Sequence, residues 1–368
     1  MMRYLLPIVI GVLVISCSEP KKEDPYSGLR PKLDSVFTSE PDFSGVLLVA
    51  DSGNVVYHKA FGLTNFDTKA PMDTASVFEL ASVSKQFTSM VIMMLAEEGK
   101  LAFDDPMEKF IPGLPYKNIT IRHLLTHTSG LPDYLELMDK HWDKSKVAGN
   151  PECIQYLIKY APAKHFEPGE KYEYSNTGYL LLASIAEKAS GIDFISFSRT
   201  RIFVPLEMTT TDLRTQEEKS RLRSMAWGHI RVPEKNAFVR ADSMPQFNYG
   251  LYLADRKGPG RISSTSTDLL KWDKALYSGR LVNDTMLTHA FSPMKLNSDS
   301  VSNYGFGWML ETHPALGKVV RHSGSNPGYN THIVRYIDVN RTIILLCNNA
   351  HPRFKQVLKS VEGLVAPY

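Results

Sequence analysis

The chain has no strong excess of charge of one sign, few cysteines and no repeat. Its 368 residues carry 42 basic and 39 acidic side chains, a net charge of +3, so the basic surface typical of a nucleic-acid-binding protein is not expected. Three cysteines are too few for a disulfide-based scaffold, and no heptad or Gly-X-Y period occurs. The hydrophobic content of 43% is sufficient for a full core. We expect a globular protein of two domains, or one large domain with an insertion.

Several motifs of common enzyme classes are also missing. The chain has neither the G-x-S-x-G turn of α/β-hydrolases nor the G-x-x-x-x-G-K-[ST] loop of P-loop enzymes. His123 and His127 have the spacing of two zinc ligands, but Leu124 stands where H-E-x-x-H enzymes have their glutamate. No third ligand is suggested, so we expect no metal and no cofactor.

The first residues have the pattern of an export signal. Residues 1–16 contain Arg3 and then an apolar run that is too short to span a bilayer comfortably, which predicts a signal peptide. The run ends at Cys17 and resembles the lipobox of bacterial lipoproteins, which implies cleavage before Cys17 and lipidation of its side chain. We expect residues 17–35 to be a flexible tether and the protein to be lipid-anchored in the bacterial cell envelope, at the periplasm and outer membrane or the outer cell surface.

Strand-like segments occur at both ends of the remaining chain. A hairpin is predicted at 45–58, and further strands at 304–310, 319–337 and 342–347. An apolar helix is predicted at 84–98, with mostly helical patterns from 104 to 260. We therefore predict an α/β (α+β) fold, in which an antiparallel sheet of about five or more strands is flanked by helices and interrupted by a mostly helical domain. The α/β domain would comprise 36–103 and 261–368, the helical domain 104–260, with a cleft between them.

A serine and a lysine at the start of the apolar helix are the first candidates for catalysis. In the tetrapeptide 82–85, S-V-S-K, Ser82 and Lys85 are three residues apart and share a helix face, whereas Ser84 points elsewhere. A lysine buried in a cleft can lose its proton and serve as a base for a serine nucleophile. The helix start adds amide donors for an oxyanion. The S-x-x-K pattern alone is weak, because it also occurs at 18–21 and 292–295.

Two further elements follow in order along the chain. Tyr174 and Asn176 lie in the tripeptide Y-S-N directly before an apolar helix, where a phenol could relay a proton. By itself this pattern is more typical of a helix cap at Asn176 and a packed ring at Tyr174 than of a catalytic site. The segment 322–325, H-S-G-S, ends a strand pattern and could offer a backbone N–H to a substrate oxygen.

With these elements the chain resembles the serine β-lactamase and penicillin-binding-protein superfamily, nearest the class C β-lactamase-related group with its D-Ala-D-Ala carboxypeptidases, D-aminopeptidases and esterases. The runs L-L-T-H-T-S-G-L-P at 124–132 and Y-G-F-G-W at 304–308 match the same group. The resemblance implies an acyl-enzyme on Ser82, with Lys85 as activating partner and Tyr174 as proton relay to the leaving group. It implies that Asn176 binds Lys85 and a substrate amide. His322, Ser323, Gly324 and Ser325 would form the substrate-binding third motif, with the oxyanion held by the N–H groups of Ser82 and Ser325.

One position departs from the pattern of the group. His322 stands where typical β-lactamases of the group have lysine, and histidine is a weaker, switchable partner for a substrate carboxylate. The neighbouring Arg321 should point to the opposite face of its strand. We predict an exported serine hydrolase acting on small-molecule or peptide amides or esters, including peptidoglycan-derived ones. The alternatives are a true β-lactamase and a non-catalytic lipoprotein sensor or binding module; the oligomeric state stays open.

Overall fold

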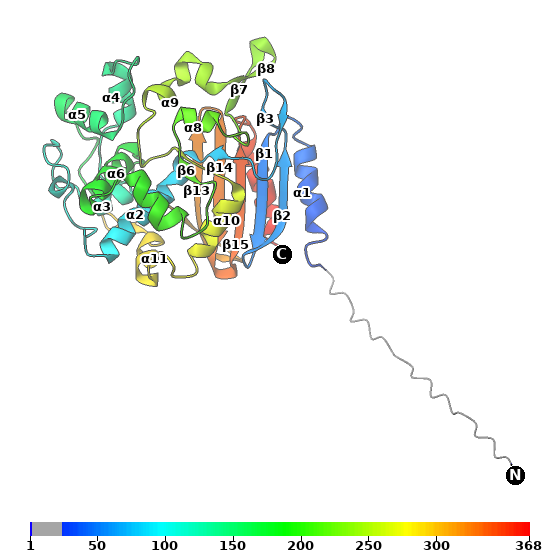
Figure 1. The fold of residues 1–368 in the computed structure, drawn as a ribbon. Coiled ribbons are helices and arrows are strands. Elements are labelled where there is room, and N and C mark those ends of the chain that lie inside the picture. Colours follow the sequence, from blue (N-terminus) through cyan, green and yellow to red (C-terminus); the bar gives the residue numbers. More distant parts are fainter. Residues whose placement is uncertain (2–23) are drawn as a thin grey trace.

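The computed structural model describes residue 1 and residues 24–368, and its centre is a six-stranded antiparallel sheet (Figure 1). The strand order is β12-β13-β14-β15-β1-β2. β1 (Gly45–Asp51), from the beginning of the fold, pairs along its whole length with β15 (Arg341–Cys347), from its end. The predicted meeting of the two ends of the chain in one sheet, with helices between them in sequence, is confirmed.

Further strands and the α-helices complete the fold. The other strands are β2 (Asn54–Phe61), β3 (Leu63–Asn65), β4 (Ala70–Pro71), β5 (Phe78–Glu79), β6 (Asp212–Leu213), β7 (His229–Val232), β8 (Ala237–Arg240), β9 (Ile262–Ser264), β10 (Met294–Lys295), β11 (Val301–Ser302), β12 (Met309–His313), β13 (Gly317–Asn326) and β14 (Tyr329–Tyr336). The α-helices are α1 (Leu29–Thr38), α2 (Lys85–Glu97), α3 (Ile121–Leu125), α4 (Tyr134–His141), α5 (Asn150–Tyr160), α6 (Asn176–Ser190), α7 (Phe194–Ser198), α8 (Gln216–Ser220), α9 (Tyr249–Tyr252), α10 (Ser266–Ala275), α11 (Asp284–Ala290) and α12 (Phe354–Val365).

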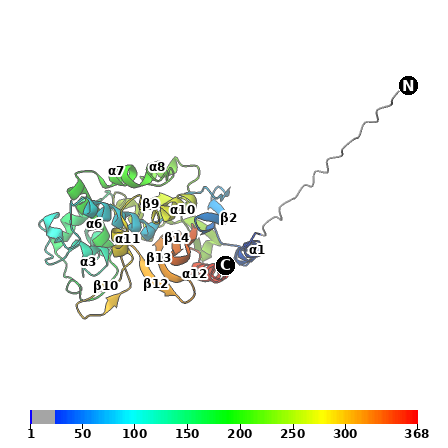
Figure 2. The same ribbon diagram turned by 90° about the horizontal axis from the view of Figure 1, so that it is seen from below.

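Both faces of the sheet are buried, and successive residues of a strand belong to different cores. On β1, Val46 and Leu48 pack into the large core beneath α2 and α10, whereas Leu47 and Val49 pack into a second core beneath α1 and α12. This alternation follows from the two-residue period of a strand. The sheet is thus the middle layer between two layers of helices, which Figure 2 shows from below.

The helix α1 corrects one prediction. The sequence pattern placed residues up to 35 in a flexible tether, but the chain is helical from Leu29 and buries Leu29, Leu33 and Phe37. These residues recur every four positions and form one apolar stripe that packs into the core beside α12. Because charged residues surround this stripe, the composition of the segment resembled that of a polar tether. The predicted signal peptide and Cys17 lie outside the described residues.

The predicted strand 304–310 is also wrong in extent, because β12 begins only at Met309. Gly305 and Gly307 interrupt the extended backbone: a side chain at Gly305 would collide with the carbonyl oxygen of Ala290, and Gly307 has a φ of 81°. The mostly helical middle of the chain, α3 to α9, lies against α2 and beside the sheet (Figure 1). Within residues 24–368, no helix has the length and apolar character needed to cross a membrane.

Candidate active site

Ser82 lies in a short 3₁₀ turn, Ala81–Ser84, that continues directly into α2. The backbone before it is fixed on both sides, because Leu80 donates its N–H to the oxygen of Ile262 at 2.8 Å and its carbonyl accepts a hydrogen bond from the Thr331 hydroxyl at 2.7 Å. Ala81 has a φ of 48°, a left-handed conformation that costs energy for a residue with a side chain. The surrounding contacts therefore hold Ser82 in one position at the start of a helix.

The two serines of the motif have different surroundings. The hydroxyl of Ser84 is buried and accepts a hydrogen bond from the backbone N–H of Ile262 at 3.2 Å. Ser82 instead lines a hollow together with Asn176 and Ser325. Only Ser82 can therefore meet a ligand in that hollow.

Lys85 is fully buried beside Ser82, and no carboxylate of residues 24–368 contacts it. Its Nζ lies 3.1 Å from Ser82 Oγ, 2.9 Å from Asn176 Oδ1 and 2.8 Å from the carbonyl oxygen of Pro259. Burial holds the pKa of Lys85 well below its usual value of 10.5; the positive charge of Arg256 acts in the same direction, and Asp133 acts against it. Burial thus makes it easier for Lys85 to lose its proton and act as a base.

The acceptors around Lys85 also orient that amine. The oxygens of Asn176 and Pro259 can only accept hydrogen bonds, so the two N–H bonds of a neutral amine point to them. The lone pair is then left for the Ser82 hydroxyl. This is the arrangement required of a general base acting on a serine.

Tyr174 lies on the turn before α6, and its ring centroid is 4.8 Å from Lys85 Nζ. Burial of its phenol raises the pKa of Tyr174 above the usual value of 10, while a hydrogen bond with Ser82 acts in the opposite direction. The phenol therefore keeps its proton at neutral pH, which leaves Lys85 as the resting base. The structure brings together Ser82, Lys85, Tyr174 and Asn176 from two separate segments, the start of α2 and the start of α6.

His127 was not predicted as a site residue from the sequence, where it stood in a matching run and in a zinc-ligand spacing that was discounted. Its ring lies 4.2 Å from that of Tyr174 between centroids, and its Nδ1 accepts the backbone N–H of Ser175 at 3.0 Å. It is fully buried, and burial together with the charge of Lys85 lowers its pKa well below 6.5. A neutral His127 thus positions the turn that carries Tyr174. In the sequence, the feature that pointed to His127 was the matching run 124–132.

The third motif runs along β13 next to the nucleophile turn. β12 pairs with β13 only as far as Arg321, so residues 322–326 have no strand partner on that side within the described chain. A side chain at Gly324 would lie 2.2 Å from the oxygen of Leu80, so only glycine allows this approach. Ser325 lines the hollow with Ser82, whereas the exposed Ser323 does not.

His322, on this strand, is buried and neutral, and its ring centroid lies 6.3 Å from that of Tyr174. Its Nδ1 donates to the oxygen of Ser323 at 2.7 Å, and its Nε2 accepts the hydroxyl hydrogen of Tyr304 at 2.8 Å. Burial is the main cause that lowers the pKa of His322 to about 3, and the charge of Lys85 adds to it. Arg321 points away and pairs with Glu311 and Glu362. Neither residue offers a free positive charge to a substrate.

A serine at a helix start, activated by a buried lysine beneath an antiparallel sheet edge, defines a serine hydrolase with an acyl-enzyme mechanism. The sequence profile of the Beta-lactamase family matches residues 33–366, and the chain belongs to that family. It is 40% identical over 342 residues to Penicillin-binding protein 4* of Bacillus subtilis (strain 168), covering 91% of this chain and 76% of that protein.

Solved structures give the same result for the fold. The octameric penicillin-binding protein homologue from Pyrococcus abyssi superimposes with a TM-score of 0.77 and 28% identity, covering 92% of this chain and 77% of that one. The D-amino acid amidase from Ochrobactrum anthropi SV3 superimposes with a TM-score of 0.74 over 93% and 99% of the two chains. At 23% identity this second likeness concerns the fold alone.

Proposed function

We propose that the protein is an exported hydrolase that forms an acyl-enzyme on Ser82 with amide or ester substrates, as a D-amino-acid peptidase or carboxypeptidase, or an esterase. The observation that carries the proposal is the hydrogen bonding of Lys85, whose two neutral oxygen acceptors leave its lone pair to Ser82. The resemblance of the sequence motifs to a group with D-Ala-D-Ala carboxypeptidases and D-aminopeptidases supports a substrate with a D-amino acid, and the name of the relative Penicillin-binding protein 4* agrees with that group.

The reaction would proceed in two steps. Ser82 Oγ bonds to the substrate carbonyl carbon while its proton passes to Lys85, and the oxyanion is held by the N–H groups of Ser82 and Ser325. The bond to the leaving group then breaks, and the leaving group takes a proton through the Tyr174 phenol. Water next gives a proton to the same groups and its oxygen to the acyl carbon, which releases the acid and restores Ser82.

The neutral His322 supports a peptidase or esterase over a β-lactamase. The pKa of about 3 and the two hydrogen bonds of its ring leave no cation at the position where lactamases of the group carry lysine. The binding-module alternative is less favoured, because the contacts among Ser82, Lys85 and Asn176 are those a catalytic site requires.

We also propose that a lipid on Cys17 anchors the protein in the bacterial cell envelope, on the evidence of the apolar run and the lipobox-like sequence. Growth with an alkyne-labelled fatty acid should label the wild-type protein. A Cys17→Ser variant should carry no label, and a label that persists in this variant would contradict the proposal.

Intact mass spectrometry of the purified protein tests the nucleophile directly. A fluorophosphonate probe should add once to the wild type and to Ser84→Ala, which retains Ser82, and not to Ser82→Ala. A lasting penicillin adduct on Ser82 would favour a cell-wall peptidase, and rapid turnover of penicillin would favour a β-lactamase. A probe adduct that survives in Ser82→Ala would show that the nucleophile is wrong, and no adduct in the wild type would favour the binding module.

A further inference from the structure

Arg256 is a buried cation without a counter-ion in the described chain. Its side chain belongs to a residue that is 6% exposed, and its Nη1 donates to the carbonyl oxygen of Leu253 at 3.1 Å. No carboxylate of residues 24–368 lies within 4.0 Å of its guanidinium. A charge removed from water is costly unless an anion compensates it, so this position is unusual.

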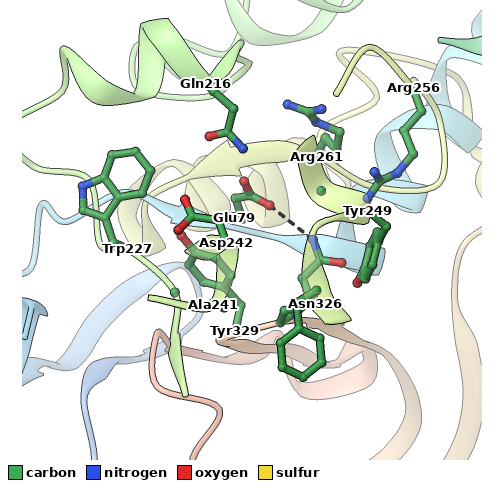
Figure 3. Close-up of a pocket in the computed structure, with 14 residues that line it drawn as sticks. Glu79, Gln216, Trp227, Ala241, Asp242, Tyr249, Arg256, Arg261, Asn326 and Tyr329 are labelled. Atoms are coloured by element: carbon green, nitrogen blue, oxygen red, sulfur yellow. Dashed lines mark hydrogen bonds between the residues drawn. The ribbon is translucent and has the colours of Figure 1, made fainter. Parts of the chain in front are cut away.

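Two other buried cations of the chain are paired with carboxylates. Arg335 pairs with Asp273, both 1% exposed in their side chains, and Lys219 pairs with Glu79. Arg261, beside Arg256 in Figure 3, uses its donors on backbone carbonyls such as that of Arg214 at 3.1 Å. Arg261 therefore adds positive charge near Arg256 without supplying an anion.

The position of Arg256 connects it with the nucleophile. It lines the hollow that contains Ser82, and it is the only cationic side chain among the residues that the structure describes there. Arg256, Tyr249 and Asn326 also line the second pocket shown in Figure 3, so the two spaces adjoin at these residues. Glu79 lies in the second cavity, but Lys219 and the amide of Asn326 already engage its carboxylate.

We propose that Arg256 binds a carboxylate on the acyl half of the substrate. This rests on the proposed function, in which Tyr174 delivers a proton to the leaving group. Tyr174 does not line the hollow that holds Ser82 and Arg256, so the hollow accommodates the other half of the substrate. A guanidinium can bind a carboxylate through two parallel N–H donors, which fixes both the charge and the direction of the acyl chain. The substrate class is therefore an amide or ester whose acyl group carries a carboxylate.

Three chromogenic esters separate the acyl half from the leaving group. The mono-4-nitrophenyl ester of adipic acid carries a carboxylate on the acyl chain, and its carboxamide analogue is neutral at the same length. The butyrate ester of 3-carboxy-4-nitrophenol carries the carboxylate on the leaving group. The full-length protein, purified in detergent, is assayed as wild type, Arg256→Gln, Arg256→Lys and Ser82→Ala, with the exposed, Asp42-paired Arg231→Gln as matched control.

The measured quantity is the ratio of kcat/KM for adipate over carboxamide within one enzyme, which cancels any change in the basicity of Lys85. We expect a ratio of about ten or more in the wild type and in Arg231→Gln, as for a hydrogen bond to a charged group. The ratio should fall to about one in Arg256→Gln and to an intermediate value in Arg256→Lys. If Arg256→Gln does not fold, the ratio of Arg256→Lys tests the role of Arg256 instead.

Two results would overturn the inference while leaving the proposed function intact. One is a wild type that hydrolyses both esters through Ser82 with no preference, or with a preference that survives in both Arg256 variants. The other is a dependence on Arg256 that appears with the leaving-group carboxylate instead. Failure of the proposed function looks different, because the wild type would then hydrolyse none of the esters or Ser82→Ala would hydrolyse them equally well.

Discussion

Two buried lysines of the chain differ in the groups that surround their amines. Lys219, at the end of α8, pairs with Glu79 on β5, and its side chain is 1% exposed. Lys85, at the start of α2, is equally inaccessible, but its hydrogen-bond partners within residues 24–368 are the neutral oxygens of Ser82, Asn176 and Pro259. Both lysines are buried, but within the described residues only Lys219 contacts a carboxylate.

The difference separates a structural cation from a base. Burial lowers the pKa of Lys219 too, but Glu79 opposes this, and the pKa of Glu79 is lowered to about 2 mainly by the charge of Lys219 against its own burial. No carboxylate in the described part of the chain contacts Lys85, so burial dominates and lowers its pKa well below 10.5. In this chain a buried lysine becomes reactive where its partners are hydroxyl and amide oxygens.

The largest expected effect follows from removing the amine of Lys85. Lys85→Met should lower kcat/KM by about 10²–10⁴-fold, because proton transfer from Ser82 is lost. Measured with the ester that the wild type hydrolyses best, a variant that is folded by circular dichroism and within tenfold of wild-type activity would contradict the assignment of Lys85 as base.

The same substitution at the other lysine should affect stability instead. Lys219→Met leaves the carboxylate of Glu79 without its ion-pair partner, and removing one member of a buried pair costs about 3–5 kcal/mol. Urea unfolding followed by fluorescence should show this loss, whereas the folded variant should keep kcat/KM within about tenfold. A Lys219→Met variant with wild-type stability and greatly reduced kcat/KM would contradict the distinction between a structural and a catalytic lysine.

The pH dependence of activity should have one ascending limb. The reactive form has neutral Lys85, so below its pKa the rate falls about tenfold per pH unit and rises with pH towards a plateau. The lowered pKa values of His322, about 3, and of His127, together with the raised pKa of Tyr174, keep these groups from titrating in the same range. A flat profile of kcat/KM between about pH 5 and 9 would count against a lysine base.

The smallest expected effect concerns His322. His322→Asn should lower kcat/KM by less than about tenfold and leave the midpoint of the ascending limb in place, because the ring is neutral and is held by hydrogen bonds with Tyr304 and Ser323. A midpoint shifted by a full pH unit would show that His322 carries charge in the active enzyme.

The sequence was sufficient for those parts of the protein that depend on local spacing. The contact of Ser82 with Lys85 follows from three-residue spacing at a helix start, and the strand pattern at both ends of the chain predicted the sheet. Arg256 and the carbonyl of Pro259 lie in a loop without periodicity, so only the folded chain shows that they reach the nucleophile. The helix α1 was missed because its short apolar stripe is surrounded by charged residues.

The most direct test of the account is the titration of Lys85 itself. In protein labelled with ¹³C at lysine Cε, the Lys85 signal is identified by its absence from the spectrum of Lys85→Met, and its shift is followed from pH 5 to 12. We predict a midpoint well below 10.5 for this signal. A midpoint at or above 10.5 would mean that Lys85 is a permanent cation, and the proposed base would be contradicted.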